Sequence, residues 1–232
     1  MQKAKKIAAI VIAGILLCGA AAGGYFIYEA TYYFKTNNAS VSARTVNVMP
    51  LVSGTVASWN VEEGQDVKEG QVLGKQDLSS LISSSKVDQA ALENSADSLL
   101  SKAEMKAPID GRIVQSNVIK GSAASAGSTV AVMADTSNLF VKANIEETDI
   151  FKIKTGQRVT IKIDAYPGKK FSGYVESIGA ATQNAFSQTA SLNTSGTYSK
   201  VVQLIPVRIS LINDEALPLI LGMNATVKIS IK

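Results

Sequence analysis

A pattern of glycines and apolar residues occurs twice in the chain, in residues 54–73 and again in residues 111–130, at an offset of 57. Three glycines keep the same spacing in both copies, and the corresponding pairs are Gly54 and Gly111, Gly64 and Gly121, and Gly70 and Gly127. Glycine adopts backbone conformations that other residues avoid, so we expect these six residues to form turns. The valines, isoleucines and leucines between them are typical of short β-strands.

Each copy is too short to enclose a hydrophobic core of its own. Roughly 30 residues do not bury enough apolar surface to offset the conformational entropy that the chain loses on folding. We therefore expect half-domains 45–77 and 105–137 to pack on each other as a pseudo-twofold β-sandwich.

The N-terminal part of the chain has the pattern of a membrane anchor. Residues 7–28 contain no charge, and three lysines precede them. A helix of about 21 residues, rising about 1.5 Å per residue, reaches about 30 Å, the thickness of the hydrocarbon layer. The pattern predicts a cytoplasmic tail at 1–6, one transmembrane helix at 7–28 and a polar linker at 29–44, with the rest of the chain outside the cytoplasm. A cleaved signal peptide is the alternative, because residues 20–23 are small.

A segment of different composition separates the two copies. From Leu92 onward its leucines and alanines fall on one helical face, which predicts a short helical insert at 78–104 with its main helix from about residue 86. The serines at 83–85 indicate a turn before that helix, and Pro108 prevents the helix from continuing.

Residues 138–232 alternate between apolar and polar side chains, with turns between the runs. About five such runs predict a small antiparallel β-barrel. A polar stretch at 180–200 is expected to be a long loop, either mobile or in contact with a partner. Residues of the insert turn and of this loop are the candidate partner contacts: Ser83, Ser84, Ser85, Phe186, Asn193 and Tyr198.

The composition argues against several kinds of chemistry. The chain has no histidine and one cysteine, so the commonest general base is missing and disulfides do not hold the fold together. The formal net charge is +4, and the three lysines of the predicted tail account for most of it, leaving +1 elsewhere. Nucleic acid is therefore not expected as a partner.

The tightest group of acids is Glu146, Glu147 and Asp149. Apolar residues at helical spacing follow directly, so we interpret the acids as the first turn of a short helix that runs to Ile153. The sequence predicts no catalytic residue, no cofactor and no metal site.

The whole pattern resembles a known family. Residues 50–73 and 108–130 resemble the two halves of a biotinyl/lipoyl-like domain, here split by the insert. Together with the anchor and the barrel they resemble the HlyD/EmrA-like membrane fusion proteins over residues 40–232. The second half opens with the family motif Ala107, Pro108, Ile109, Asp110 and Gly111. The barrel carries Asp164, Ala165, Tyr166, Pro167 and Gly168, and later Gln203, Ile205, Pro206, Val207 and Arg208.

This resemblance implies a non-enzymatic, membrane-anchored adaptor of an export or multidrug efflux system. It also implies a homo-oligomer beside an inner-membrane transporter of the ABC or major-facilitator type. One departure is clear: relatives carry two long helices that reach an outer-membrane channel, whereas this insert has at most 27 residues. Folded in half it would reach only about 20 Å, which argues against docking to a distant channel.

Two other functions fit parts of the sequence. Glu104, Met105 and Lys106 resemble the modified segment of a biotin or lipoate carrier, although Lys106 directly precedes the next predicted strand instead of lying in a turn. A membrane-tethered protein that binds the cell envelope, without a transporter, is the other alternative.

Overall fold

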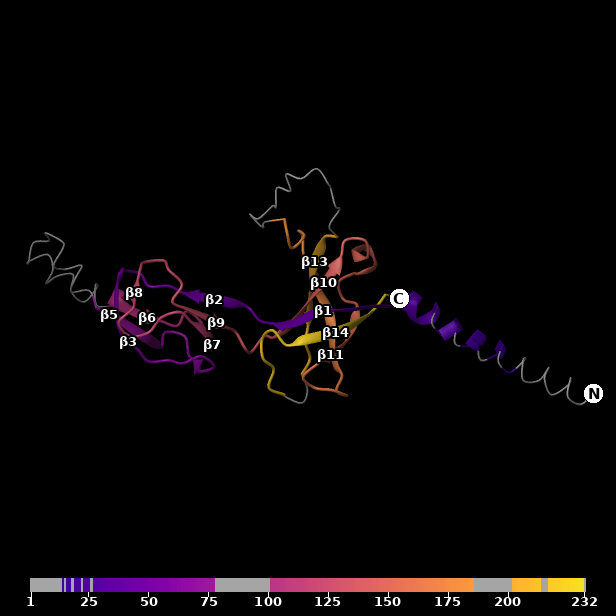
Figure 1. Ribbon diagram of the computed structural model, residues 1–232, viewed down its shortest axis with the longest axis horizontal. Coiled ribbons are helices and arrows are strands. Elements are labelled where there is room, and N and C mark those ends of the chain that lie inside the picture. Colours follow the sequence, from indigo (N-terminus) through magenta and orange to yellow (C-terminus); the bar gives the residue numbers. More distant parts are fainter. Residues whose placement is uncertain are drawn as a thin grey trace, which may run out of the picture. The chain divides into compact units, whose positions relative to one another are not determined.

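The computed structural model describes residues 14, 16–17, 19–21, 23–25, 27–77, 101–185, 202–213 and 217–231. Two compact units make up the fold (Figure 1). Ala43–Leu139 forms one of them, a β-sandwich, and the segments before and after it form the other, a β-barrel.

The sandwich contains two four-stranded sheets. The strands of the first sheet, in spatial order, are β2 (Thr45–Val48), β9 (Ala131–Ala134), β7 (Gly111–Ser116) and β4 (Asp66–Val67). Those of the second are β6 (Glu104–Lys106), β5 (Val72–Asp77), β3 (Gly54–Trp59) and β8 (Ala123–Ala124). Each sheet combines strands from both halves of the repeat.

The backbone hydrogen bonds of the sandwich repeat with the same offset of 57 as the sequence. The N–H of Gly64 donates to the carbonyl of Ile113 over 2.7 Å, and that of Gly121 donates to Val56 over 2.8 Å. Gly70 donates to Ala107 and Gly127 to Pro50 in the same way. Each half thus supplies two turns that bond to a strand or loop of the other half, which confirms that the two copies pack on each other.

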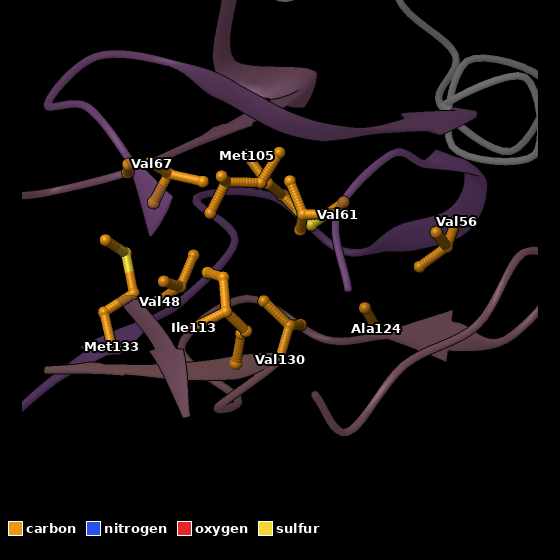
Figure 2. Packing of buried hydrophobic residues seen from close by; sticks show 12 residues of the cluster. Val48, Val56, Val61, Val67, Met105, Ile113, Ala124, Val130 and Met133 are labelled. Carbon is orange, nitrogen blue, oxygen red and sulfur yellow. The ribbon is translucent and has the colours of Figure 1, made fainter. Parts of the chain in front are cut away.

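The core of the sandwich lies between the sheets, and both halves contribute to it (Figure 2). The corresponding residues Val56 and Ile113 are both buried, and so are Leu73 and Val130. In Figure 2 the side chains of Val67, Met105 and Val61 point toward those of Ile113, Val130 and Met133. Neither half would bury these side chains alone, so the duplication is a condition of stability.

The six repeat glycines fall into two kinds. Gly64, Gly70, Gly121 and Gly127 lie in turns and have positive φ. Gly54 and Gly111 are not turn residues, because they begin strands β3 and β7. A Cβ on Gly111 would lie 2.3 Å from the carbonyl oxygen of Ala134, so close packing of two backbones requires glycine there.

The barrel is closed by six antiparallel strands rather than about five. In order around the barrel they are β1 (Tyr33–Ser42), β10 (Phe140–Glu146), β13 (Leu204–Ser210), β12 (Phe171–Ile178), β11 (Arg158–Ile163) and β14 (Asn224–Ser230). Alternate residues point inward, as in β11, where Val159, Ile161 and Ile163 are buried and their neighbours are exposed.

Two sequence-based interpretations of this unit are wrong. Residues 29–44 are not a linker, because β1 pairs with both β10 and β14 and closes the barrel. Glu146, Glu147 and Asp149 do not form the first turn of a helix. Glu146 is the last residue of β10, where it pairs with Leu204, and only a short 3₁₀ turn, η1 (Ile150–Lys152), follows.

Several predicted features lie wholly or largely outside the described residues. They are the tail at 1–6, much of the span at 7–28, most of the insert at 78–104 and most of the loop at 180–200. All six candidate contacts, Ser83, Ser84, Ser85, Phe186, Asn193 and Tyr198, are outside as well. Within the described part of the chain, none of the helical segments has the length and apolar character needed to cross a membrane.

Candidate functional site

No group of three or more histidine, cysteine or acidic residues lies close enough to hold a metal ion among the described residues. The acids near the end of β10 are spread over a strand end and a turn, and Asp149 forms an ion pair with Lys152 at 2.6 Å. The described residues form surfaces from which other segments of the chain extend or to which other molecules could bind.

The first surface is the base of the insert. The insert leaves the sandwich from β5 and returns in β6, and these neighbouring strands place Lys75 opposite Glu104. Glu104 lies 2.9 Å from the ammonium of Lys75 and 3.1 Å from that of Lys106. The hydrogen bond from Lys75, and then that from Lys106, lowers the pKa of Glu104 below its ordinary value. Glu104 therefore forms ion pairs with a lysine of β5 and a lysine of β6 at the place where the insert begins.

This arrangement also bears on the carrier alternative. Lys106 is the last residue of β6 and pairs with Glu104, whereas a carrier domain presents its lysine in a tight turn. The sequence alone placed Lys106 next to a strand, and the structure places it within one.

The second surface is a hollow of about 370 Å³ in the sandwich. Its wall includes Met49, Pro50, Leu51, Lys106 and Pro108. Met49 and Leu51 are exposed although both are apolar. No pattern in the sequence indicated this hollow, because its wall joins residues from both halves of the repeat.

The third surface is a larger hollow of about 650 Å³ in the wall of the barrel. It lies where the pairing of β1 with β10 stops, at Ala39 and Ala143, while β1 continues along β14. At that point the side-chain amide of Asn144 donates a 3.0 Å hydrogen bond to Oδ1 of Asn38. The hollow has a mostly polar wall that includes Lys35, Glu146 and Asp149.

The fourth feature is the junction between the N-terminal helix and the barrel. The helix continues to Tyr32, and β1 begins at the next residue. The ammonium of Lys228 on β14 lies 2.7 Å from the carboxylate of Glu29 and 4.0 Å from the ring centre of Tyr33. The backbone N–H of Ile231 also donates to the carbonyl of Tyr32.

At this junction the ion pair favours the charged form of both partners. The hydrogen bond from Lys228 lowers the pKa of Glu29, and the hydrogen bond to Glu29 raises the pKa of Lys228. Sequence reasoning missed both residues. Glu29 was visible only as the first charge after the apolar run, and Lys228 only as an outward residue of a strand, so nothing in the pattern indicated that they meet.

Comparison with known proteins agrees with this architecture. Residues 44–136 match the family model described as "RND MFP, barrel-sandwich hybrid domain", and residues 139–229 match a YknX-like beta-barrel domain. Over 204 residues the chain is 37% identical to a putative efflux system component, YhbJ, of Bacillus subtilis, and the match covers 87% of this chain and 81% of that protein. The chain belongs to the membrane fusion protein family. As a membrane fusion protein, it is an adaptor component of an efflux system.

Other relatives are longer than this membrane fusion protein. The multidrug export protein EmrA of Haemophilus influenzae is 35% identical over 153 residues, which is 62% of this chain and only 39% of EmrA. Among solved structures, a MacA–MexA chimera that carries the Pseudomonas aeruginosa MexA α-hairpin has a TM-score of 0.66 at 21% identity, with 87% of this chain and 82% of the chimera covered. At that identity the likeness establishes the fold alone.

Proposed function

We propose that this membrane fusion protein is a non-enzymatic adaptor, anchored by one helix in the cell membrane, that works beside an inner-membrane transporter on the extracytoplasmic side. The observation that carries the proposal is the 37% identity to an efflux system component over most of both chains. The apolar run at 7–28 supports the anchor, and the lysines before it favour a cytoplasmic N-terminus.

The partner would be a transporter of the ABC or major-facilitator type, which supplies the energy that an adaptor does not. The chain would act in several copies, whose sandwiches and barrels stand side by side and line or gate the path of the substrate. The segment between Asp77 and Glu104 has at most 26 residues, so tip-to-tip docking on a distant outer-membrane channel is not part of the proposal.

The test is an export assay in cells that lack this chain. We expect the full chain to restore efflux of the substrate, and a version without residues 7–28, secreted by a cleavable signal, to fail. Replacing 7–28 by an unrelated single transmembrane helix is the matched control and should restore export. Full export by the secreted, untethered version would overturn the anchored mechanism.

A second measurement separates an adaptor from an envelope-binding protein. The full chain, purified in mild detergent, should bring a multi-spanning transporter with it, and purification of the transporter should bring back the chain. Recovery of cell-wall material without any transporter would contradict the adaptor function. The intact mass of the chain should show no added biotin or lipoyl group on Lys106.

A further inference from the structure

The strand register determines which loops share an end of the barrel. β1 and β10 are antiparallel neighbours, so the start of β1 at Tyr33 and the end of β10 at Glu146 lie at the same end of the barrel. The partners of these residues lie there too: Tyr33 pairs with Ser230 at the end of β14, and Glu146 pairs with Leu204 at the start of β13. The β10–β11 loop, residues 147–157, therefore lies at the end of the barrel where the N-terminal helix enters. We call this the anchor end. The β13–β14 loop, which contains Ile220, lies at the other end, because Ser210 pairs with Phe140.

The helix joins the anchor end of the barrel directly. No linker separates Tyr32 in the helix from Tyr33 in β1, and the Glu29–Lys228 ion pair holds the last helical turn to β14. At about 1.5 Å per residue, Tyr25 lies only about 10 Å along the helix from Tyr32, its last residue. If the helix spans the membrane with its tyrosines at the interface, the anchor end lies at the level of the lipid headgroups.

An exposed aromatic ring is present at that end. Phe151 is 72% exposed in the 3₁₀ turn η1, in which no residue is buried. Val202, which precedes β13 at the same end, is 52% exposed. A single exposed apolar side chain is ordinary on a soluble surface, so it is the position beside the anchor that gives these two a role.

The charges around Phe151 bear on how this loop would bind a membrane. Residues 147–157 contain two acids, Glu147 and Asp149, and two lysines, Lys152 and Lys154. Lys152 pairs with Asp149, and its ammonium lies 5.7 Å from the centre of the Phe151 ring. Because these charges cancel, as do those of the flanking residues Glu146 and Arg158, attraction to anionic lipids would contribute little, and insertion of the ring would dominate.

We propose that the β10–β11 loop is a second membrane contact, in which the Phe151 ring inserts among the lipid headgroups beside the helical anchor. This inference rests on the proposed anchor at 7–28. Its consequence is mechanical: two points of contact, one through the helix and one through the loop, restrict the tilt of the barrel over the membrane surface.

The test places an environment-sensitive fluorophore at single cysteines in the full chain, with Cys18 changed to serine, in phosphatidylcholine vesicles. The labelled variants are Phe151→Cys, Tyr25→Cys in the anchor and Ile220→Cys, which is 64% exposed at the opposite barrel end. Lipids with a nitroxide high on the acyl chain should quench the probes at 25 and 151 and leave the probe at 220 unquenched. Adding phosphatidylglycerol or salt should change the quenching at 151 little.

The outcomes separate the inference from the anchor on which it rests. Quenching at 25 but not at 151 overturns the second contact and leaves the anchor standing, whereas no quenching at either site overturns both. Shielding at 151 that occurs only when a transporter is reconstituted with the chain would make the occupant a protein and overturn the lipid contact.

A second variant set moves the probe away from position 151, so that the native ring can be compared with its replacements. With the probe on exposed Thr155 of the same loop, Phe151→Asp should abolish the quenching by nitroxide lipids and Phe151→Leu should retain most of it. Equal quenching in both variants would show that the ring is not what inserts.

Discussion

The carboxylate of Glu29 lies 2.7 Å from the ammonium of Lys228, although 199 residues separate them in the chain. The contact joins the N-terminal helix to the last strand of the barrel. Because β1 follows the helix without a linker, this contact lies where the chain passes from the helix into the barrel.

Removing this ion pair should loosen the junction without unfolding the barrel. In Lys228→Ala we expect faster amide hydrogen exchange at residues 27–33 and a nearly unchanged melting temperature, since half-exposed ion pairs contribute little to global stability. Lys152→Ala, which breaks the ion pair with Asp149, is the matched control. The charge-swapped double variant Glu29→Lys with Lys228→Glu should recover the protection, and unchanged exchange in Lys228→Ala would contradict the role of the pair.

The turns at Gly64 and Gly121 in the sandwich should respond alike to substitution. Gly64 and Gly121 have φ of 86° and 90°, and a Cβ on either would meet nothing within 4 Å, so the cost of a side chain is backbone strain alone. Valine at either position should lower the free energy of unfolding by about 1–3 kcal/mol. Asparagine, which tolerates positive φ, should lower it less. Denaturant unfolding followed by the fluorescence of Trp59, the single tryptophan, measures this, and equal effects of valine and asparagine would contradict the strain argument.

Gly111 should fail for a different reason from the turn glycines. A Cβ there would lie 2.3 Å from the carbonyl oxygen of Ala134, so Gly111→Ala forces β7 and β9 apart. We expect a loss of about 1–3 kcal/mol in the free energy of unfolding, as for other overpacked positions. Val114→Ala, an exposed change in the same strand, is the control and should have little effect. If Gly111→Ala unfolds at the same denaturant concentration as the parent chain, the close approach of the strands is not limiting.

The Asp66–Arg112 ion pair should make the sandwich sensitive to acid. Two 2.8 Å hydrogen bonds join the guanidinium of Arg112 in the second half to the carboxylate of Asp66 in the first. The hydrogen bond from Arg112 is the main cause that lowers the pKa of Asp66 below 3.8. A lowered carboxyl pKa contributes stability that is present above the unfolded pKa and is lost as the pH falls through the lower folded pKa.

The measurement is urea unfolding followed by Trp59 fluorescence, from about pH 7 to about pH 3, for the parent chain and Asp66→Asn. The parent should be the more stable at neutral pH, and the difference should shrink in the acid range. Glu69→Gln, at a nearby exposed position, is the control. A difference that stays constant over the whole range would show that the charge of Asp66 does not matter.

Much of the sandwich was predictable because its information is local and repeated. The spacing of Gly64 and Gly70, and its recurrence at Gly121 and Gly127, determines where turns with positive φ occur. The apolar positions between them determine which strand faces point inward, and the shortness of each copy requires a partner half. The family also followed from the sequence, since its motifs are runs of neighbouring residues.

The tertiary structure decided how the polar segment after the N-terminal helix is used. Lys35, Asn37 and Asn38 looked like linker residues, yet they are outward positions of β1, whose inward residues include Ala39 and Val41. A strand that closes a barrel gains its hydrogen bonds from β10 and β14, which lie at least 98 residues farther along the chain, so no local pattern reports it. The same holds for Glu29 with Lys228 and for the end of the barrel at which Phe151 lies, because contacts between distant segments exist only once the barrel has closed.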